Sequence, residues 1–389
     1  AAVAVLFVDI VGKGHGAFQA TYIKLSVNYD QDLLGIENLS DPEQLMMGNW
    51  DAVPKVALRE KFTDVSGRRD KRRLNGLLSN GAGFDLKDRL LANPQLLNTT
   101  ESIWLLADDD IDTYYKSWLD GEAYAARLSD KQVVWIDQLH EQGLIRLQLN
   151  TNLVTRGDSR EPEQAGIRGA VMGSLLTLVL TLILSFPIGV SAAIYLEEFA
   201  PKNKWTDFIE VNINNLAAVP SIIFGLLGLA IFINFFHVPR SVPIVGGLVL
   251  TLMTLPTIII TSRAAIKSVP PSIREAALGM GASKYQMVLH HVLPLAMPGM
   301  LTGAIIGMAQ ALGESAPLLM IGMVAFIVDI PAGFNDPATV LPVQIFLWAD
   351  SPERAFIEKT SAAIMVLLSF LIVMNTSAVW LRKRLERRW

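Results

Sequence analysis

A set of long apolar runs in the second half of the sequence limits the possible fold more than any other feature. Each run is long enough to cross about 30 Å of hydrocarbon at about 1.5 Å per helical residue. We expect membrane-spanning helices near 168–196, 215–236, 242–262, 289–313 and 357–381. Only a helix satisfies the backbone polar groups of such a run in lipid. A composition of 51% hydrophobic and 18% charged residues agrees with an integral membrane protein.

The first apolar segment, residues 1–8, is about half as long as a spanning helix requires. We interpret residues 1–11 as the remnant of a first transmembrane helix. A signal-peptide core is the competing interpretation, but no basic segment precedes it and no small-residue cleavage site follows it cleanly. The stretch 289–328 is too long for one crossing and contains several prolines, so we expect one span, a turn and a short, partly embedded helix.

Basic residues near the spans predict the orientation, because they are retained on the cytoplasmic side. The tail 382–389 carries five of them, which places the C-terminus on the cytoplasmic side of the membrane: Arg382, Lys383, Arg384, Arg387 and Arg388. Counting spans backwards places the basic segment 263–288 inside as well, so the two assignments agree. The same count places residues 12–166 outside the cell membrane.

Residues 12–166 are polar enough to fold as an extracytoplasmic lobe inserted into the membrane protein. Apolar spacing predicts strands at Thr21–Tyr29 and Gly143–Leu149 and helices in 42–62, 84–92 and 129–142. The predicted fold is therefore an all-α polytopic membrane protein of about six spans, the first truncated, with an α+β lobe. We predict a transmembrane domain at 167–381. The basic cluster at 68–73 and the run Asp108-Asp109-Asp110 are interpreted as solvated faces rather than a partner site and a cation site.

The segment 268–294 predicts a helical elbow between two spans. Pro270 and Pro271 stop the preceding span, Ser272 can cap a short helix, and Glu275 can complete a capping box. Gly279 and Gly281 end that helix, and Lys284 begins a second one. Such an elbow is a stiff, protruding feature suited to fit a groove on a cytoplasmic partner.

The elbow also resembles a known family. Glu275-Ala276-Ala277, Gly281 and Leu293-Pro294 are similar to the EAA loop of ABC-importer permeases, with His291 departing from the usual Ile. The stretch 311–319 resembles the segment that marks PstA-type permeases of phosphate importers, and Pro187-Ile188-Gly189, 194–198 and 218–222 are in the same style. The resemblance covers roughly 167–381 and leaves the lobe unexplained.

The resemblance implies a permease fold of the type I importers, a place in the bacterial cytoplasmic (inner) membrane and a function in phosphate import. It implies that five elbow residues couple the chain to an ATPase: Arg274, Glu275, Ala276, Ala277 and Gly281. The implied partners are a second permease subunit (PstC-like), an ATP-binding subunit (PstB-like), an external phosphate-binding protein (PstS-like), phosphate and the lipid bilayer. ATP is then hydrolysed by a partner, and this chain binds no cofactor.

Two spans each carry one hydroxyl-bearing face, because Ser and Thr recur at intervals of three and four residues. These residues are Ser174, Thr177, Thr181 and Ser185 in one span, and Thr251, Thr254, Thr257 and Thr261 in another. Helix packing through hydroxyl hydrogen bonds is one explanation, and a path for a hydrated anion, with Thr254 and Thr257 on it, is the other. Gly299, Gly303 and Gly307 predict a close helix contact, within the chain or with a second permease chain.

Two charged residues stand out because a charge at mid-bilayer costs about 2.5–3.5 kcal/mol. Arg263 either snorkels to the cytoplasmic surface or offers a phosphate a forked, permanently charged donor. Glu314 either lies at a helix end or pairs within the membrane, with Arg263 or with the other permease chain. The sequence leaves both pairs of alternatives open.

Several function classes are excluded or disfavoured. The chain has no cysteine, which excludes thiol catalysis and thiolate metal sites, and five scattered histidines disfavour a zinc enzyme. No segment fits G-x-x-x-x-G-K-[ST], G-x-S-x-G or H-E-x-x-H, so we expect no catalytic residue and no metal ligand. The net charge of −4 gives no sign of nucleic-acid binding. A permease for another oxyanion or solute stays open, and a membrane-anchored sensor is disfavoured by its short inner tail.

Overall fold

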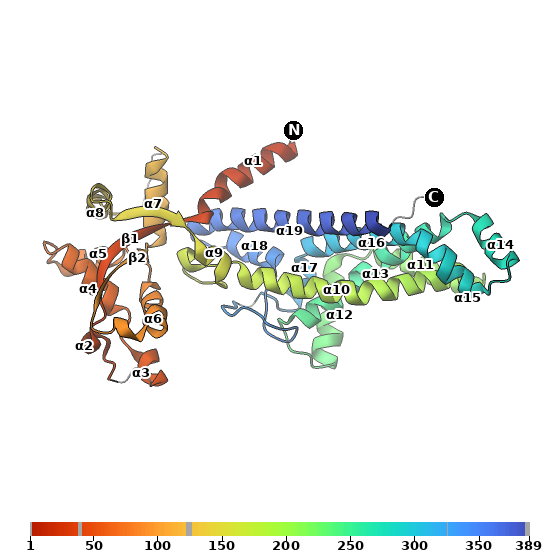
Figure 1. Cartoon of the computed structure of the whole chain (residues 1–389), viewed down its shortest axis with the longest axis horizontal. Helices are drawn as coiled ribbons and strands as arrows, with labels where there is room; N and C mark the ends of the chain where they lie inside the picture. Colours follow the sequence, from red (N-terminus) through yellow and green to blue (C-terminus); the bar gives the residue numbers. More distant parts are fainter. Residues whose placement is uncertain (1, 38–40, 122–126, 325, 386–389) are drawn as a thin grey trace. The chain divides into compact units, whose positions relative to one another are not determined.

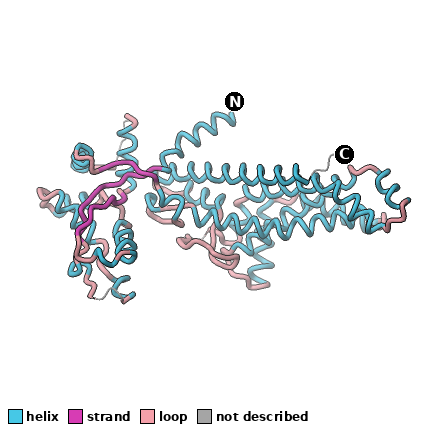
Figure 2. The backbone as a smooth tube through the Cα atoms, viewed as in Figure 1, coloured by secondary structure: helices cyan, strands magenta, loops and turns pink. Residues whose placement is uncertain are grey.

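A computed structural model describes residues 2–37, 41–121, 127–324 and 326–385 of the chain. They separate into two compact units. Unit 1 comprises Ala1–Gly166 and Ser351–Ala362, and unit 2 comprises Ile167–Asp350 and Ala363–Trp389. The three strands described all belong to unit 1, whereas the described elements of unit 2 are helical (Figure 2).

Unit 1 is built on an antiparallel sheet of order β2-β1-β3. Its strands are β1 (Gln19–Asn28), β2 (Thr100–Leu106) and β3 (Ile145–Leu149). In β1 the alternate residues Ile23, Leu25 and Val27 are buried, as the period of two in a pleated strand requires. The predicted strands at Thr21–Tyr29 and Gly143–Leu149 are confirmed. The central strand β1 also pairs with β2, a strand that the apolar spacing did not predict.

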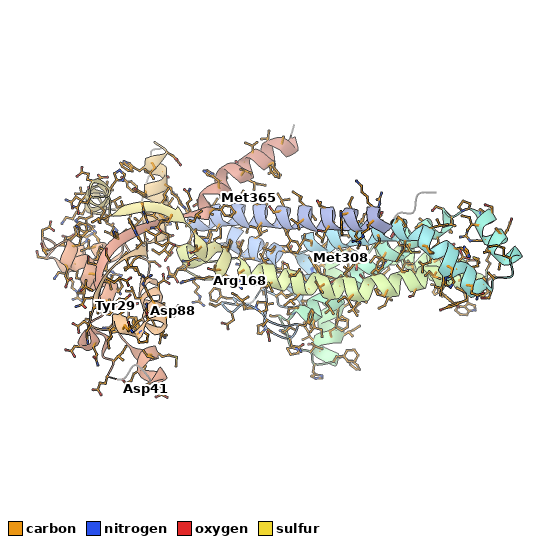
Figure 3. The ribbon with its side chains drawn as sticks, in the orientation of Figure 1. Tyr29, Asp41, Asp88, Arg168, Met308 and Met365 are labelled. Atoms are coloured by element: carbon orange, nitrogen blue, oxygen red, sulfur yellow. The ribbon has the colours of Figure 1, made fainter. Side chains whose placement is uncertain are left out.

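Short helices pack around this sheet and enclose one hydrophobic core. The core includes Tyr29, labelled in Figure 3, whose side chain is fully buried. The helices of eight or more residues are α4 (Ala52–Lys61), α5 (Arg68–Asn75), α6 (Ala82–Ala92), α7 (Asp109–Leu119) and α8 (Asp130–Glu141). The shorter ones are η1 (His15–Phe18), α2 (Gln31–Leu34), α3 (Pro42–Met47), η2 (Pro94–Leu96), α9 (Thr151–Thr155) and η3 (Pro162–Gln164). These elements confirm the predicted α+β lobe.

The predicted helices at 84–92 and 129–142 are confirmed by α6 and α8, and the helical spacing over 42–62 is divided between α3 and α4. The chain leaves the helix at Gly48, where φ is −54° and ψ is 146°, and re-enters a helix at Ala52. The Trp50 indole N–H donates to the Leu45 carbonyl oxygen at 2.8 Å and so holds the interruption in place. Glycine has a low helix propensity, which makes it a weak point in the predicted helix.

Unit 2 is a bundle of long helices (Figure 1). Among the described residues, four continuous helical segments are long and apolar enough to cross a membrane: Arg168–Phe199, Pro243–Lys267, Lys284–Gly313 and Ala355–Arg384. The first contains α10 (Arg168–Ile194) and η4 (Tyr195–Phe199), and the second is α13 (Pro243–Lys267). The third contains α15 (Lys284–Met287), η6 (Val288–Val292) and α16 (Leu293–Gly313), and the fourth lies in α19 (Ala355–Leu385).

The predicted span 215–236 is wrong as a straight helix. The chain forms α11 (Lys204–Ala217), then α12 (Ser221–Gly228) continued by η5 (Leu229–Phe235), with a bend of 101° at the break. Pro220 stands at this bend. Proline lacks the N–H that a continuing helix needs and drives the preceding residue out of the helical region. Counted as one bent span, this pair brings the number of candidate spans among the described residues to five.

The remaining helices are α1, at the start of the sequence, and two short helices between α16 and α19. The helix α1 (Ala2–Gly14) covers the segment interpreted as a span remnant. The short helix expected after the 289–313 span is α17 (Ala316–Met320), and α18 (Leu341–Ala349) was not expected. Of the predicted basic tail 382–389, the first four residues continue α19, and 386–389 lie outside the described residues.

The start of α19 belongs to unit 1 rather than to the bundle, which differs from the boundaries predicted for the transmembrane domain. The buried Lys359 ammonium donates to the Ala165 carbonyl oxygen at 2.6 Å. Lys116 of α7 lies 2.7 Å from Asp112 and 3.2 Å from Glu358. These polar contacts join the first turns of α19 to the lobe, and no local sequence pattern indicates them.

Candidate functional site

The elbow between α13 and α16 begins with the short helix α14 (Pro271–Gly279). Pro270 is the N-cap, and Pro271 occupies the first helical position. Proline suits this position because its fixed φ is helical and an N–H there would have no partner within the helix. The predicted capping box of Ser272 and Glu275 is therefore wrong. Ser272 already lies within the first turn, and the helix start has no side-chain capping bond.

A capping box does occur at the second short helix of the elbow, α15. Gln286 donates its backbone N–H to the Ser283 hydroxyl oxygen at 3.3 Å, and Ser283 donates its N–H to the Gln286 side-chain oxygen at 2.9 Å. Between the two helices Gly281 has a φ of +88°, a region that residues with a Cβ rarely adopt. The turn that was predicted from Gly279 and Gly281 therefore depends on glycine at position 281.

The elbow has a buried inner face and an exposed outer face. Ala277 is 1% exposed and packs in a hydrophobic cluster that also contains Ile266, Val269, Met287, Val288 and Val292. On the outer face Leu278, Met280 and Tyr285 are 47%, 77% and 64% exposed, and Glu275 and Ala276 are exposed beside them. We call these five exposed residues the knob. It lies at the end of the bundle that carries the labels α14 and α15 (Figure 1).

Arg274 faces away from the knob and fixes α14 to its neighbours. Its guanidinium donates to Glu198 Oε1 at 2.8 and 3.1 Å. It also donates to the backbone carbonyl oxygens of Ile266, at 2.9 Å in the last turn of α13, and of Val269, at 2.6 Å just after that helix. Because one planar group binds both η4 and the end of α13, the elbow is held rigidly against two long helices.

Arg263 lies in the same region and is 9% exposed, so it does not snorkel to a surface in this structure. Its Nε donates to Glu197 at 2.5 Å, and its Nη2 lies 2.6 Å from Glu210 of α11. Lys267 is 3.3 Å from the same Glu197 oxygen. These contacts give Arg263 two carboxylate partners that were not expected from the sequence.

Arg263, Lys267, Arg274, Glu197, Glu198 and Glu210 together form what we call the elbow ion network. The cations come from α13 and α14, and the carboxylates come from η4 and α11. Three positive and three negative side chains balance one another. The sequence does contain a signal for this network. Acidic residues follow one apolar span directly, and basic residues follow another span.

Glu314 does not pair with Arg263. It is the half-buried C-cap of α16. The Cβ of a side chain at Gly303 would clash with Thr261, so Arg263 lies close to the level of residue 303. Glu314 is eleven residues further along the helix, about 16 Å away at about 1.5 Å per residue. Glu314 thus lies at a helix end, and its pairing with the other permease chain stays a prediction.

The hydroxyl faces lie inside the bundle. Thr254 is fully buried and donates to the Thr251 carbonyl oxygen at 3.2 Å, while Thr257 is partly buried. Ser174 accepts the Leu341 N–H at 2.8 Å, and a cavity lined by Ser174 and Thr177 has a volume of about 10 Å³. A space of this size holds at most about one water, so in this conformation these hydroxyls serve helix packing.

The glycine ridge of α16 packs against α13 of the same chain. A Cβ at Gly299 would lie 2.6 Å from the Ala265 Cβ, and a Cβ at Gly303 would overlap Thr261. Gly307 faces Thr254 and Ile258 at ordinary contact distance. The predicted close helix contact is confirmed, and its partner is a helix of this chain.

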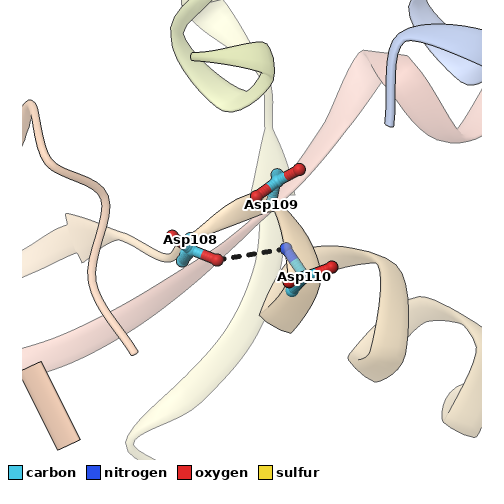
Figure 4. A group of neighbouring side chains, drawn as sticks. All are labelled: Asp108, Asp109 and Asp110. Atoms are coloured by element: carbon cyan, nitrogen blue, oxygen red, sulfur yellow. Dashed lines mark hydrogen bonds between the residues drawn. The ribbon is translucent and has the colours of Figure 1, made fainter. Parts of the chain in front are cut away.

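The two charged clusters of the lobe differ in exposure. The basic cluster forms α5, where Arg68, Arg69 and Arg72 are exposed, as expected for a solvated helix face. The aspartate run at 108–110 is half-buried at the start of α7 (Figure 4). Its interpretation as a solvated face stays a prediction.

Comparison with protein families divides the chain into two parts. Residues 185–389 match the model described as "binding-protein-dependent transport system inner membrane component". Residues 1–125 match a domain of unknown function, DUF3333. The elbow and its ion network lie within the first of these matches.

Individual relatives and solved structures are similar to more than half of the chain. A probable ABC transporter permease protein, YqgI of Bacillus subtilis, is 32% identical, covering 60% of this chain and 83% of that protein. Phosphate transport system permease protein PstA of Haemophilus influenzae is 27% identical, covering 58% and 79%. PstA 1 of Mycobacterium tuberculosis is 28% identical, covering 58% and 73%. A chain of the inward-facing MetNI methionine ABC transporter is 20% identical, covering 57% and 96%, with a TM-score of 0.47.

Proposed function

This chain belongs to the family of binding-protein-dependent transport system inner membrane components, and from that premise we propose that it is the PstA-type permease of a phosphate importer. Its family and its apolar helices make it an integral protein of the inner membrane and a permease subunit of an ABC importer rather than a catalyst. In the proposed assembly it forms half of a translocation path together with a PstC-like permease. A PstS-like binding protein delivers phosphate, and the C-terminus is cytoplasmic.

The knob is the observation that carries the coupling part of this proposal. Leu278, Met280 and Tyr285 expose apolar surface on a helix pair whose other face is firmly packed. Exposed apolar patches of this kind mark interaction sites. The elbow must be rigid to transmit the movement of a partner to the long helices, because a flexible elbow would deform instead. We therefore assign the knob to a PstB-like ATPase, which hydrolyses ATP while this chain binds no nucleotide.

The coupling proposal is tested by placing a charge on the knob. Met280→Glu should abolish co-purification of the ATPase subunit and ATP-dependent uptake in reconstituted vesicles, while membrane insertion stays normal. Met47→Glu is the matched control, because Met47 of unit 1 is 86% exposed and lies outside the elbow. Normal uptake by the Met280 variant would show that the knob does not couple.

A second variant tests the geometry of the elbow. Gly281→Val should abolish uptake, because a β-branched residue is strained at a φ of +88° even though no atom lies within 4 Å of its Cβ position. Gly279→Val is the comparison, since its Cβ position is equally open and its φ is not in that region. Uptake lost equally in both variants would mean that side-chain bulk, not backbone conformation, is responsible.

The substrate is the part of the proposal that rests on the names of the relatives. Phosphate uptake by the reconstituted assembly should be competed by arsenate, which has the same charge and shape, more strongly than by sulfate. Stronger competition by sulfate would favour the second candidate function, a permease of the same architecture for another oxyanion.

A further inference from the structure

The last span, in α19, ends at a basic segment. Of the four continuous spans among the described residues, it is the least buried by the rest of the structure. Residues 360–381 carry no charge, and at about 1.5 Å per residue they extend about 33 Å, close to the thickness of the hydrocarbon. Trp380 is 61% exposed, and tryptophan is enriched where hydrocarbon meets headgroups. Arg382 therefore lies at the level of the lipid headgroups.

An apolar groove lies between α19 and two other helices of unit 2. Its volume is about 140 Å³. Apolar side chains form most of its wall: Leu182 of α10, Leu301, Ile305 and Met308 of α16, and Met374 and Leu381 of α19. Met308 is labelled in Figure 3. A dry apolar cavity of about 150 Å³ can hold a hydrocarbon the size of benzene, so this groove has room for a segment of one hydrocarbon chain.

Arg382 is held beside one end of this groove. It directly follows the groove residue Leu381, and its Nη1 donates to the Thr302 hydroxyl oxygen at 3.1 Å. Thr302 in turn follows the groove residue Leu301 on α16. The bond to Thr302 uses one of the five N–H donors of the guanidinium. The remaining donors are available to an anion at the end of the groove.

Two more cations accompany Arg382. Lys383 and Arg384 follow it in the sequence, and the Arg384 guanidinium lies 5.6 Å from the centre of the Trp380 ring. In the described part of the chain, no carboxylate forms an ion pair with any of these three cations. Each basic side chain near an anionic membrane surface gains about 1 kcal/mol. A lipid anion would therefore complement this segment.

We propose that the groove and the three cations bind one phospholipid with an anionic headgroup. One hydrocarbon chain fills the groove between α16 and α19, and the lipid phosphate accepts hydrogen bonds from Arg382, as a planar guanidinium favours. This site requires that unit 2 lies in a membrane, which its family and its apolar helices support. It does not depend on the substrate or the ATPase proposed above.

A membrane helix of another chain is the competing occupant. Asn375 also lines the groove, and its Oδ1 is buried without a hydrogen-bond partner among the described residues. A polar side chain on such a helix could donate to this oxygen. The cations favour a lipid, because an anionic phospholipid carries its charge at the level where its hydrocarbon chains end. The groove and Arg382 have the same arrangement.

Native mass spectrometry of the full chain tests the site. The delipidated protein in detergent micelles is titrated with phosphatidylglycerol and, in parallel, with phosphatidylcholine of the same acyl chains. We expect one phosphatidylglycerol to be retained with at least tenfold higher affinity than phosphatidylcholine. Arg382→Gln should lower the affinity for phosphatidylglycerol at least fivefold. Arg240→Gln is the matched control, because Arg240 is an exposed arginine of unit 2 that does not line the groove.

A second pair of variants tests the groove without changing any charge. Ala378 lines the groove, so Ala378→Phe should fill it and lower the affinity for phosphatidylglycerol at least fivefold. The neighbouring Val379 is 40% exposed and does not line the groove, so Val379→Phe should leave the affinity unchanged.

The same measurements can overturn the assignment. Equal affinity for the two lipids would refute it, and so would an affinity that Arg382→Gln leaves unchanged. An equal loss in Arg240→Gln would show that the lipid responds to overall charge rather than to this site. A dimer that excludes phosphatidylglycerol would assign the groove to a second chain instead. If Ala378→Phe fails to fold, the parent titration and Arg382→Gln still decide, and no outcome depends on transport.

Discussion

Replacing Arg274 with alanine should loosen the elbow by an amount that follows from its contacts. The Arg274 and Glu198 side chains are only 22% and 8% exposed. Without Arg274, the Glu198 carboxylate stays buried without its cation, and removing one partner of such a pair costs about 3–5 kcal/mol. We take the lower end, about 3 kcal/mol, because Arg274 is partly solvated. Since about 1.4 kcal/mol is a factor of ten, protection of α14 against local opening should fall about a hundredfold.

Amide hydrogen exchange of residues 271–279 in nanodiscs measures this opening directly. In the double variant Arg274→Ala/Glu198→Ala, protection of α14 should be roughly tenfold higher than in Arg274→Ala. No carboxylate is then left unpaired, and the remaining loss relative to the parent is that of two hydrogen bonds to carbonyl oxygens. Lys267→Ala should change exchange less than fivefold, since that side chain is 63% exposed. Parent-like exchange in Arg274→Ala, or no recovery in the double variant, would refute the role of this ion pair.

Further predictions concern the lobe. Lys116→Met should lower its free energy of unfolding by about 3 kcal/mol, because Asp112 and Glu358 both lose a buried cation; tryptophan fluorescence in denaturant measures this. Tyr29→Phe should raise the same quantity by about 1 kcal/mol, since the buried Tyr29 hydroxyl has no hydrogen-bond partner among the described residues. Burial raises the pKa of Tyr29 to about 12, so the parent should lose stability relative to this variant as the pH rises from 10 to 12. A Tyr29 phenolate absorbance that appears near pH 10 in the folded protein would contradict this.

Local chemistry explains which parts of the fold could be predicted. Continuous apolar runs identify Arg168–Phe199 and Pro243–Lys267 because every residue of a span faces lipid or other helices, so the signal accumulates along the chain. The turn at Gly281 could be predicted because its positive φ is a property of one residue. The capping box was expected at Ser272 instead of Ser283, since two candidate serines have the same spacing and a proline at the first helical position removes the need for one of them.

Contacts between distant segments could not be predicted in the same way. The link between Lys116 and Glu358 joins residues that are 242 positions apart, and neither position carries a motif. The bend at Pro220 was not expected because the apolar composition of 215–236 continues across it, while only the backbone changes direction. The sequence shows which residues are charged or apolar, but the partner of a charged residue and the direction of the backbone depend on the whole fold.

Arg263 shows the functional consequence of such a hidden partner. As an isolated residue it could donate to a phosphate at the inner end of a path, but in this structure Glu197 and Glu210 already accept from it. A phosphate that displaced Glu197 from Arg263 would leave that carboxylate beside an added anion with only the largely exposed Lys267 as its cation, and breaking a buried pair costs about 3–5 kcal/mol. Such a cost weakens binding by a factor of about a hundred to several thousand. An anion could therefore use Arg263 only after α13 has moved apart from both η4 and α11, which would couple access to Arg263 with movement of the elbow that Arg274 fixes to α13 and η4.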